Sequence, residues 1–164
     1  MCDASQTDPF VTLKLGKKKI QRTRAIDNAG GHNVVFDETL SWFDKGLFES
    51  KLMVKVMDSD TLSDDTLGEN LVNLNELEIP EEGEINKKWI NCTKQSGLIS
   101  TETKKTGKVL LSFSRIACPR GAFEGLLHIT VISIDGFKNK VDIVCKNLFL
   151  LVRAFVHACV LVFK

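Results

Sequence analysis

The sequence predicts an all-β protein, an antiparallel sandwich of about eight strands. Several short segments alternate apolar and other residues with a period of two, which is the pattern of a half-buried strand. Turn-forming and charged residues separate these segments, as is typical of β-sandwiches. The length of 164 residues is enough for one domain with a hydrophobic core and for few residues outside it.

The first expected strand follows Pro9, whose fixed φ and missing N–H suit the first position of a strand. A later strand places Leu52, Val54 and Val56 on one face, with the alternation of a half-buried strand. We expect strands at 10–15, 19–26, 33–42, 51–57, 67–73, 87–91, 108–116 and 126–133.

Two segments are expected outside the strands. We expect a short helical turn at residues 74–77, before an acidic loop. Residues 94–107 are rich in Thr, Lys, Ser and Gly, which predicts an exposed loop.

The most informative segment is an acidic loop directly after the expected strand 51–57. Four aspartates fall within eight residues here, at 58, 60, 64 and 65. Carboxylates held this close repel one another unless a cation lies between them, and hard oxygen donors in a flexible loop suit Ca²⁺. The alternative is an acidic turn that is simply solvated.

A second acidic segment lies near the start of the chain. Asp3 and Asp8 stand at the edge of the first expected strand, just before Pro9. Two loops of the sandwich therefore carry carboxylates at a strand end.

These segments together resemble the C2 domain family. The string Asp-Pro-Phe-Val-x-Leu-x-Leu-Gly at 8–16 is followed by the loop Asp-x-Asp-x3-Asp-Asp-x-x-Gly at 58–68. The resemblance continues through 33–40 and ends at 107–113, so it runs from about residue 3 to 116 in the family's order. It implies a calcium-dependent, phospholipid-binding β-sandwich.

The resemblance also implies a set of calcium ligands and a lipid-inserting residue. Leu62 at the tip of the second loop would insert among lipid headgroups. The implied ligands are Asp3, Asp8, Asp58, Asp60 and Asp65, with Ser63 or Asp64 as a further oxygen donor. Bound Ca²⁺ would change the local potential from negative to positive and so attract anionic membranes.

A basic segment forms a second candidate lipid-binding surface. It resembles the basic strand that some C2 domains use for phosphoinositides, and its bases are Lys17, Lys18, Lys19, Arg22 and Arg24. The alternative is a solvated hairpin. Nucleic acid is not expected as a partner, because no aromatic residues are interleaved with the bases and 22 basic residues nearly balance 21 acidic ones.

The late segment 126–133 resembles a C2 first strand, which the chain lacks ahead of Asp3. It alternates Leu127, Ile129 and Val131 with outward residues. Either the chain is a fragment of a tandem C2-domain protein, or the late strand fills the first-strand position as in a permuted domain. We expect the late strand to fill the first-strand position, where it would pair with the strand 51–57 or with a neighbour of that strand.

The predicted organisation therefore has three parts. Residues 1–116 form the C2-like domain, 117–140 hold a linker and the first-strand-like segment, and 141–164 form an apolar tail that is helical or aberrant. A membrane anchor is disfavoured for the tail because the central Arg153 would cost about 2.5–3.5 kcal/mol on insertion.

The expected function is calcium-dependent binding to membranes that contain phosphatidylserine or phosphoinositide. The alternative is a calcium-independent protein-interaction or structural C2 module. No catalytic constellation stands out among the scattered histidines, so an enzyme is not expected. The absence of an apolar leader and of Cys-x-x-Cys pairs predicts a cytoplasmic protein, peripheral at membranes.

Overall fold

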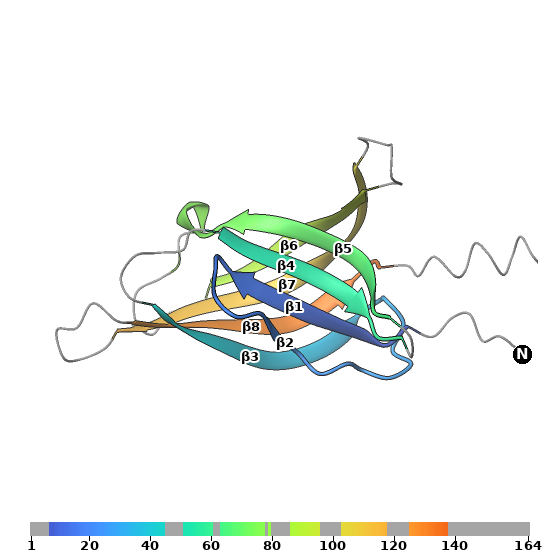
Figure 1. The fold of residues 1–164 in the computed structure, drawn as a ribbon, viewed down its shortest axis with the longest axis horizontal. Helices are drawn as coiled ribbons and strands as arrows, with labels where there is room; N and C mark the ends of the chain where they lie inside the picture. Colours follow the sequence, from blue (N-terminus) through green and yellow to red (C-terminus); the bar gives the residue numbers. More distant parts are fainter. Residues whose placement is uncertain are drawn as a thin grey trace, which may run out of the picture.

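The computed structural model describes residues 7–44, 51–60, 63–77, 79, 86–95, 103–117 and 125–137 (Figure 1). Within these ranges the chain is all-β, as predicted, and every strand pairing is antiparallel. The elements are β1 (Pro9–Leu15), β2 (Gln21–Arg22), β3 (Val34–Asp44), β4 (Lys51–Asp58), β5 (Asp65–Asn73), η1 (Leu74–Glu76), β6 (Asn86–Gln95), β7 (Thr103–Ala117) and β8 (Gly125–Asp135).

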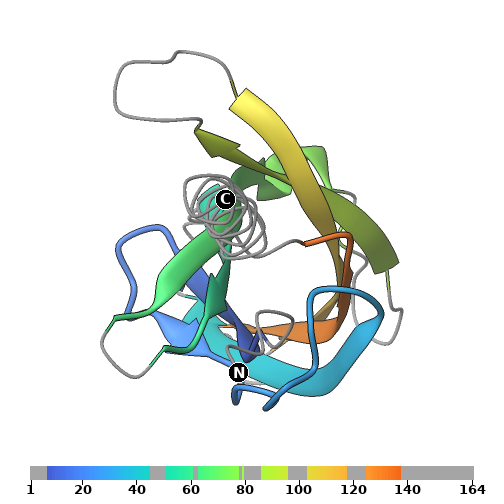
Figure 2. The ribbon, with the colours of Figure 1, turned by 90° about the vertical axis from the view of Figure 1, so that its right-hand side faces the viewer.

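The eight strands form one nearly closed sheet in the order β2-β1-β4-β5-β6-β7-β8-β3. Seen end-on, the strands surround a common interior (Figure 2). β5 and β6 are joined by the single residue pair Glu69 and Thr93, whereas the neighbouring pairings are long. The sheet therefore consists of two four-stranded halves that face each other, which is a β-sandwich.

The interior is filled by the inward residues of both halves. In β4 the predicted alternation holds, since Leu52, Val54 and Val56 are fully buried. Leu13 of β1 and Phe113 of β7 pack into the same cluster. Burial of this apolar surface holds the two halves together.

The late strand is part of this sheet. β8 pairs with β7 on one side and with β3 on the other. The expected neighbour was wrong, because β4 pairs with β1 and β5 and not with β8. The reason is the register: Ala117 of β7 pairs with Gly125 of β8, so β8 returns directly along β7 as a hairpin.

Other boundaries differ from the sequence prediction. The expected strand 19–26 is reduced to the two residues of β2. The prediction of a loop at 94–107 was wrong for residues 94–95 and 103–107, because β6 extends to Gln95 and β7 begins at Thr103. The Thr and Lys residues there pair across a long hairpin, and the helical turn expected at 74–77 is observed as η1.

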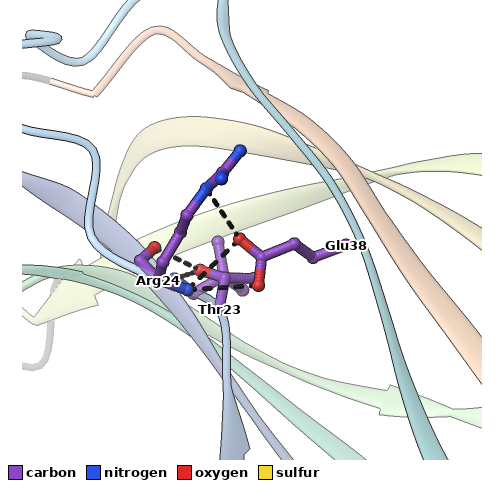
Figure 3. Close-up of polar contacts among 4 residues, drawn as sticks. Thr23, Arg24 and Glu38 are labelled. Atoms are coloured by element: carbon purple, nitrogen blue, oxygen red, sulfur yellow. Dashed lines mark hydrogen bonds and ion pairs between the residues drawn. The ribbon is translucent and has the colours of Figure 1, made fainter.

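Side chains close the remaining gap in the sheet, between β2 and β3. The carboxamide of Gln21 pairs with the main chain of Ser41: its Nε2 donates to the carbonyl oxygen at 2.6 Å and its Oε1 accepts from the N–H at 3.4 Å. Further along, the carboxylate of Glu38 accepts from the N–H of Arg24 and forms an ion pair with its guanidinium, with Nε and Oε1 3.2 Å apart (Figure 3). These bonds satisfy main-chain groups that two strand edges would otherwise expose.

Candidate functional site

Three strand ends bring the predicted carboxylates together. Asp8 directly precedes β1, Asp58 ends β4 and Asp65 begins β5. Pro9 is paired with Asp58, and Asp58 with Asp65, across adjacent strands. We call this end of the sandwich the aspartate end; it faces the viewer in Figure 2.

Main-chain hydrogen bonds fix the two innermost carboxylates. Oδ1 of Asp58 accepts from the N–H of Asp8 at 2.8 Å, and Oδ1 of Asp8 accepts from the N–H of Asn28 at 2.6 Å. The N–H of Ser59 donates to the carbonyl oxygen of Asp8 at 3.0 Å. Asn28 adopts a left-handed conformation with φ 53°, which Asn tolerates better than most residues.

A β-bulge lies beside this site. Val56 pairs with Gly68 and Met57 with Thr66, so Leu67 is the extra residue on β5. Bulges sharpen the local twist and redirect the strand end. The bulge therefore sets the direction in which Asp65 and the loop before it leave the sheet.

Asp58 is the most perturbed carboxyl group at this end. Its side chain is buried, with 2 % of the residue exposed. Burial raises the pKa of Asp58, the N–H of Asp8 opposes this effect, and the negative charges of Asp60, Asp8 and Asp65 raise the pKa further. The ionised form is therefore less stable in the folded protein than in water.

This shift predicts that Asp58→Asn raises the stability of the calcium-free protein at neutral pH. Because the folded-state pKa lies above the unfolded one, the ionised carboxylate destabilises the fold above both values, and protonation removes this effect at low pH. Asn keeps the acceptor for the N–H of Asp8 but carries no charge. Thermal unfolding in chelator should show a melting temperature higher by a few degrees at pH 7, and no gain near pH 3. A lower melting temperature at pH 7 would contradict it.

The donor set fits Ca²⁺ in kind, because it consists of carboxylate oxygens. The hydroxyl of Thr7, one residue before Asp8, is buried and makes no hydrogen bond in the described part of the chain. In the arrangement described, however, no three acidic, His or Cys side chains lie close enough to hold a metal ion among the residues that the structure describes. The carboxylates of Asp8 and Asp58 are turned toward main-chain N–H groups instead.

The remaining predicted site residues divide into two groups. Asp60, Ser63 and Asp64 are exposed and flank the tip of the second loop at the aspartate end. Asp3 and Leu62 lie outside the described residues. Asp37 lies in β3 with a left-handed φ of 51°.

The predicted basic surface spreads along the length of β2 and its flanks. Lys17, Lys18 and Lys19 lie at the turn after β1, at the end opposite the aspartates. Arg22 pairs with the middle of β1, and its guanidinium lies 5.4 Å from the ring centroid of Phe10. Arg24 is held in the ion pair with Glu38. Both arginines have structural contacts although they are exposed, and the ammonium group of Lys18 donates to the carbonyl oxygen of Phe43.

Two sets of interacting polar side chains were not predicted from the sequence. The Nδ1 of His32 lies 3.4 Å from Asp135, and Lys108 lies 3.6 Å from the same carboxylate. Partial burial acts to raise the pKa of Asp135, but the hydrogen bond from His32 and the charge of Lys108 hold it below its usual value. These residues come from three segments that become adjacent only when β8 docks.

The other unanticipated grouping is a Ser–His pair on neighbouring strands. The hydroxyl of Ser41 lies 2.7 Å from Nδ1 of His128, and their strands pair at these positions. No acidic side chain orients His128 in the described part of the chain, so the arrangement of a catalytic triad is not present there. An ordinary cross-strand hydrogen bond accounts for the contact.

Cys92 is a free thiol in the core of the sheet. Burial, with a smaller contribution from Glu69, raises its pKa to about 12. A thiol in this state is not reactive at neutral pH. The other four cysteines lie outside the described residues.

Comparison with known protein families matches residues 2–92 to the C2 domain. This match spans the aspartate end, the basic segment and both acidic loops. The chain belongs to the C2 domain family. A curated relative is the 16 kDa phloem protein 1 of Arabidopsis thaliana, which is 36% identical over 74 residues. That similarity covers 43% of this chain and 47% of the relative, so it spans about half of the phloem protein's length.

The C2 fold suggests membrane or protein partners in general. Within the residues that the structure describes, no helix has the length and apolar character needed to cross a bilayer. The apolar tail at 141–164 lies outside those residues.

Proposed function

We propose that this C2 domain binds anionic phospholipid membranes in a calcium-dependent manner through its aspartate end. The observation that carries the proposal is that Asp8, Asp58 and Asp65 lie at three adjacent strand ends with Asp58 buried. Burial and the negative charges of Asp60, Asp8 and Asp65 raise the pKa of Asp58. A divalent cation between these groups would relieve that repulsion. The proposal places the protein at the cytoplasmic surface of membranes, and it includes no enzymatic activity.

In this proposal Asp8, Asp58, Asp60 and Asp65 hold the cation, with Asp3 and Ser63 or Asp64 as further donors. Bound Ca²⁺ supplies positive charge and open coordination positions for lipid phosphate oxygens. The protein's own part is to place Asp8, Asp58 and Asp65 at three adjacent strand ends, and the side chains of Asp8 and Asp58 would turn from main-chain N–H groups toward the ion. The exposed positions of Asp60, Ser63 and Asp64 leave the outer side of the loop accessible to a membrane.

The expected result is that Asp58→Asn with Asp60→Asn abolishes calcium-dependent pelleting with phosphatidylserine vesicles. The two amides remove two negative charges from the site, while the β-sheet circular dichroism should stay unchanged. Vesicle sedimentation in Ca²⁺ and in chelator measures the effect. Asp37→Asn is the matched control, because this aspartate is exposed on β3 and Asn suits its positive φ. If the double variant still pellets more in Ca²⁺ than in chelator, the site is wrongly assigned.

A calcium-independent protein-interaction or structural module is the second candidate. Its supporting observation is that Asp8 and Asp58 accept main-chain hydrogen bonds, which gives both carboxylates a structural role. The two candidates differ in one measurement. Isothermal titration calorimetry with Ca²⁺ measures the heat of binding. Under the first proposal the wild-type chain gives a heat of binding and Asp58→Asn does not. Under the second proposal neither chain gives one.

A further inference from the structure

We propose that the apolar segment 147–163 of this chain docks on the outer face of the sheet half formed by β6, β7, β8 and β3. Among the residues that the structure describes, no helix or further strand lies over this face, since the short η1 follows β5 in the other half. Segment 147–163 lies outside the described residues. Apart from Asn147, Arg153 and His157, it consists of apolar residues.

Two rows of side chains on the outer face expose large apolar groups. The first row crosses three paired strands and consists of Phe43, Leu126 and Ile116. The second row crosses all four strands and consists of Val35, Ser133, Leu110 and Trp89. The exposed fractions are 74% for Phe43, 62% for Val35, 46% for Ile116 and 42% for Trp89. Exposed apolar side chains gathered on one face are typical of an interaction surface.

Both rows point away from the core. The β7 residues that pack into the core are Val109, Leu111 and Phe113. Successive side chains of a strand point to opposite faces, so Leu110 and Ile116 lie on the outer side of β7. Residues paired directly across neighbouring strands share a face, which places the rest of both rows on the same side.

Between the rows the face carries polar groups that already bond to one another. The hydroxyl groups of Thr39 and Thr130 lie 2.8 Å apart, and the hydroxyl of Ser41 lies 2.7 Å from Nδ1 of His128. Covering these side chains therefore removes few hydrogen bonds to water.

Charged groups lie at the rim of the face. Asp37 is exposed at the bulge of the edge strand β3, and Lys87 is exposed on β6 at the opposite edge. Arg153 is the only Lys, Arg, Asp or Glu in segment 147–163. Asp37 complements it in charge, so a docked segment can keep Arg153 at the rim.

The position and length of the chain after β8 also suit this occupant. Phe137 follows β8, a central strand of the face, at the aspartate end (Figure 1). The chain from Phe137 to Asn147 reaches at most about 33–36 Å. The stretch of β8 from Leu126 to Asp135 spans about 30 Å, so the segment can reach both rows. The rows are about 23 Å apart along β8, and residues 147–163 extend about 26 Å even at the rise of a helix.

A tethered segment fits this face better than a second copy of the chain or a bilayer does. A short linker holds the segment near the face at an effective concentration on the order of 1 mM, which separate chains in dilute solution do not reach. In a bilayer Arg153 would lie in the middle of the apolar segment, within the hydrocarbon. At the rim of a protein face its guanidinium group remains in water or beside Asp37.

Tryptophan fluorescence of the full-length chain tests the docking. Trp89 lies on the face, whereas Trp42, the other tryptophan, is buried and gives a constant background. Acrylamide should quench Trp89 weakly in the wild-type chain. Leu151→Glu with Phe155→Glu should raise the quenching to that of an exposed tryptophan, because docking would bury two charges. Leu151→Met with Phe155→Leu keeps the segment apolar, and this control should be quenched like the wild type.

Trypsin cleavage after Arg153 tests the face itself, and it does not depend on tryptophan. Val35→Ser with Phe43→Ser removes two exposed apolar side chains from the face, and the full-length variant should be cleaved at Arg153 faster than the wild type. Leu71→Ser changes an exposed leucine on β5 in the other half, and this control should be cleaved at the wild-type rate. Mass spectrometry of the fragments measures the rates.

Sedimentation velocity and added phosphatidylcholine vesicles separate the possible occupants. Shielding of Trp89 that persists in the monomer without vesicles, and that both sets of substitutions remove, supports docking within one chain. The proposal is overturned if the glutamate variant and the wild type are quenched equally. It is also overturned if shielding disappears as a dimer dissociates on dilution, as for a second copy, or if it arises only with vesicles, as for a segment that inserts into a bilayer.

Discussion

A chain that ends at Pro119 should not show the cooperative thermal unfolding of the intact protein. This truncation removes β8 and all residues beyond it. Five apolar side chains of that segment are at most 3 % exposed in the core: Leu127, Ile129, Val131, Ile134 and Phe137. Burial of each contributes about 1.5–3 kcal/mol, and the five together are comparable to the whole stability of a typical domain, about 5–15 kcal/mol.

The truncation also exposes two strand edges. β7 and β3 would each lose their pairing with β8, and their main-chain groups would face an open slot. The control is a chain that ends at Phe137, which keeps β8 and removes only residues 138–164. Circular dichroism melting should distinguish the two. If the chain ending at Pro119 melts at the same temperature as the control, β8 contributes nothing to the fold.

The sequence was sufficient for the strands, because their alternation is a local property of the chain. The alternation of Leu52, Val54 and Val56 predicted β4, and the alternation in 126–133 predicted a strand there. The neighbours of β8 were wrong because pairing partners depend on the whole topology. The length of β7 was underestimated because its first part, Thr103 to Gly107, pairs with β6 in a hairpin whose residues are mostly polar.

The site could be predicted only in part. Aspartates at strand ends were visible in the sequence, and the structure brings Asp8, Asp58 and Asp65 to one end. Their hydrogen bonds to main-chain N–H groups were not visible, because the donors belong to segments up to 50 residues away. The ion pair of Arg24 with Glu38 was missed for the same reason: it crosses the gap between β2 and β3.

The second large effect concerns the ring of Phe137, which closes the aspartate end of the core. Its N–H donates to the carbonyl oxygen of Gly31 at 2.9 Å, and its ring lies against two glycines. A Cβ on Gly107 of β7 would lie 2.7 Å from Cδ2 of the ring, and one on Gly68 of β5 would lie 3.0 Å from Cε1. These glycines therefore leave the space that the ring occupies.

Phe137→Ala should destabilise the protein by about 3–5 kcal/mol, because the ring is buried and its removal leaves a cavity. Gly107→Ala should cost about 1–3 kcal/mol, since the new methyl group overlaps the ring. Urea unfolding of the two single variants and the double variant measures their coupling. Gly125→Ala is the control, because its Cβ would meet only a carbonyl oxygen at 3.4 Å.

The double variant tests whether Gly107 is needed because a side chain there would overlap the ring of Phe137. Once Phe137 is replaced by Ala, the methyl group on residue 107 enters the vacated space and has nothing to overlap. Gly107→Ala should then cost little, and it could add stability by about 0.4–1 kcal/mol because Ala has less conformational freedom than Gly in the unfolded chain. The two substitutions would thus be coupled by more than about 0.5 kcal/mol. Additive losses would mean that Gly107 is required for the backbone of β7 and that the fit of the ring is incidental.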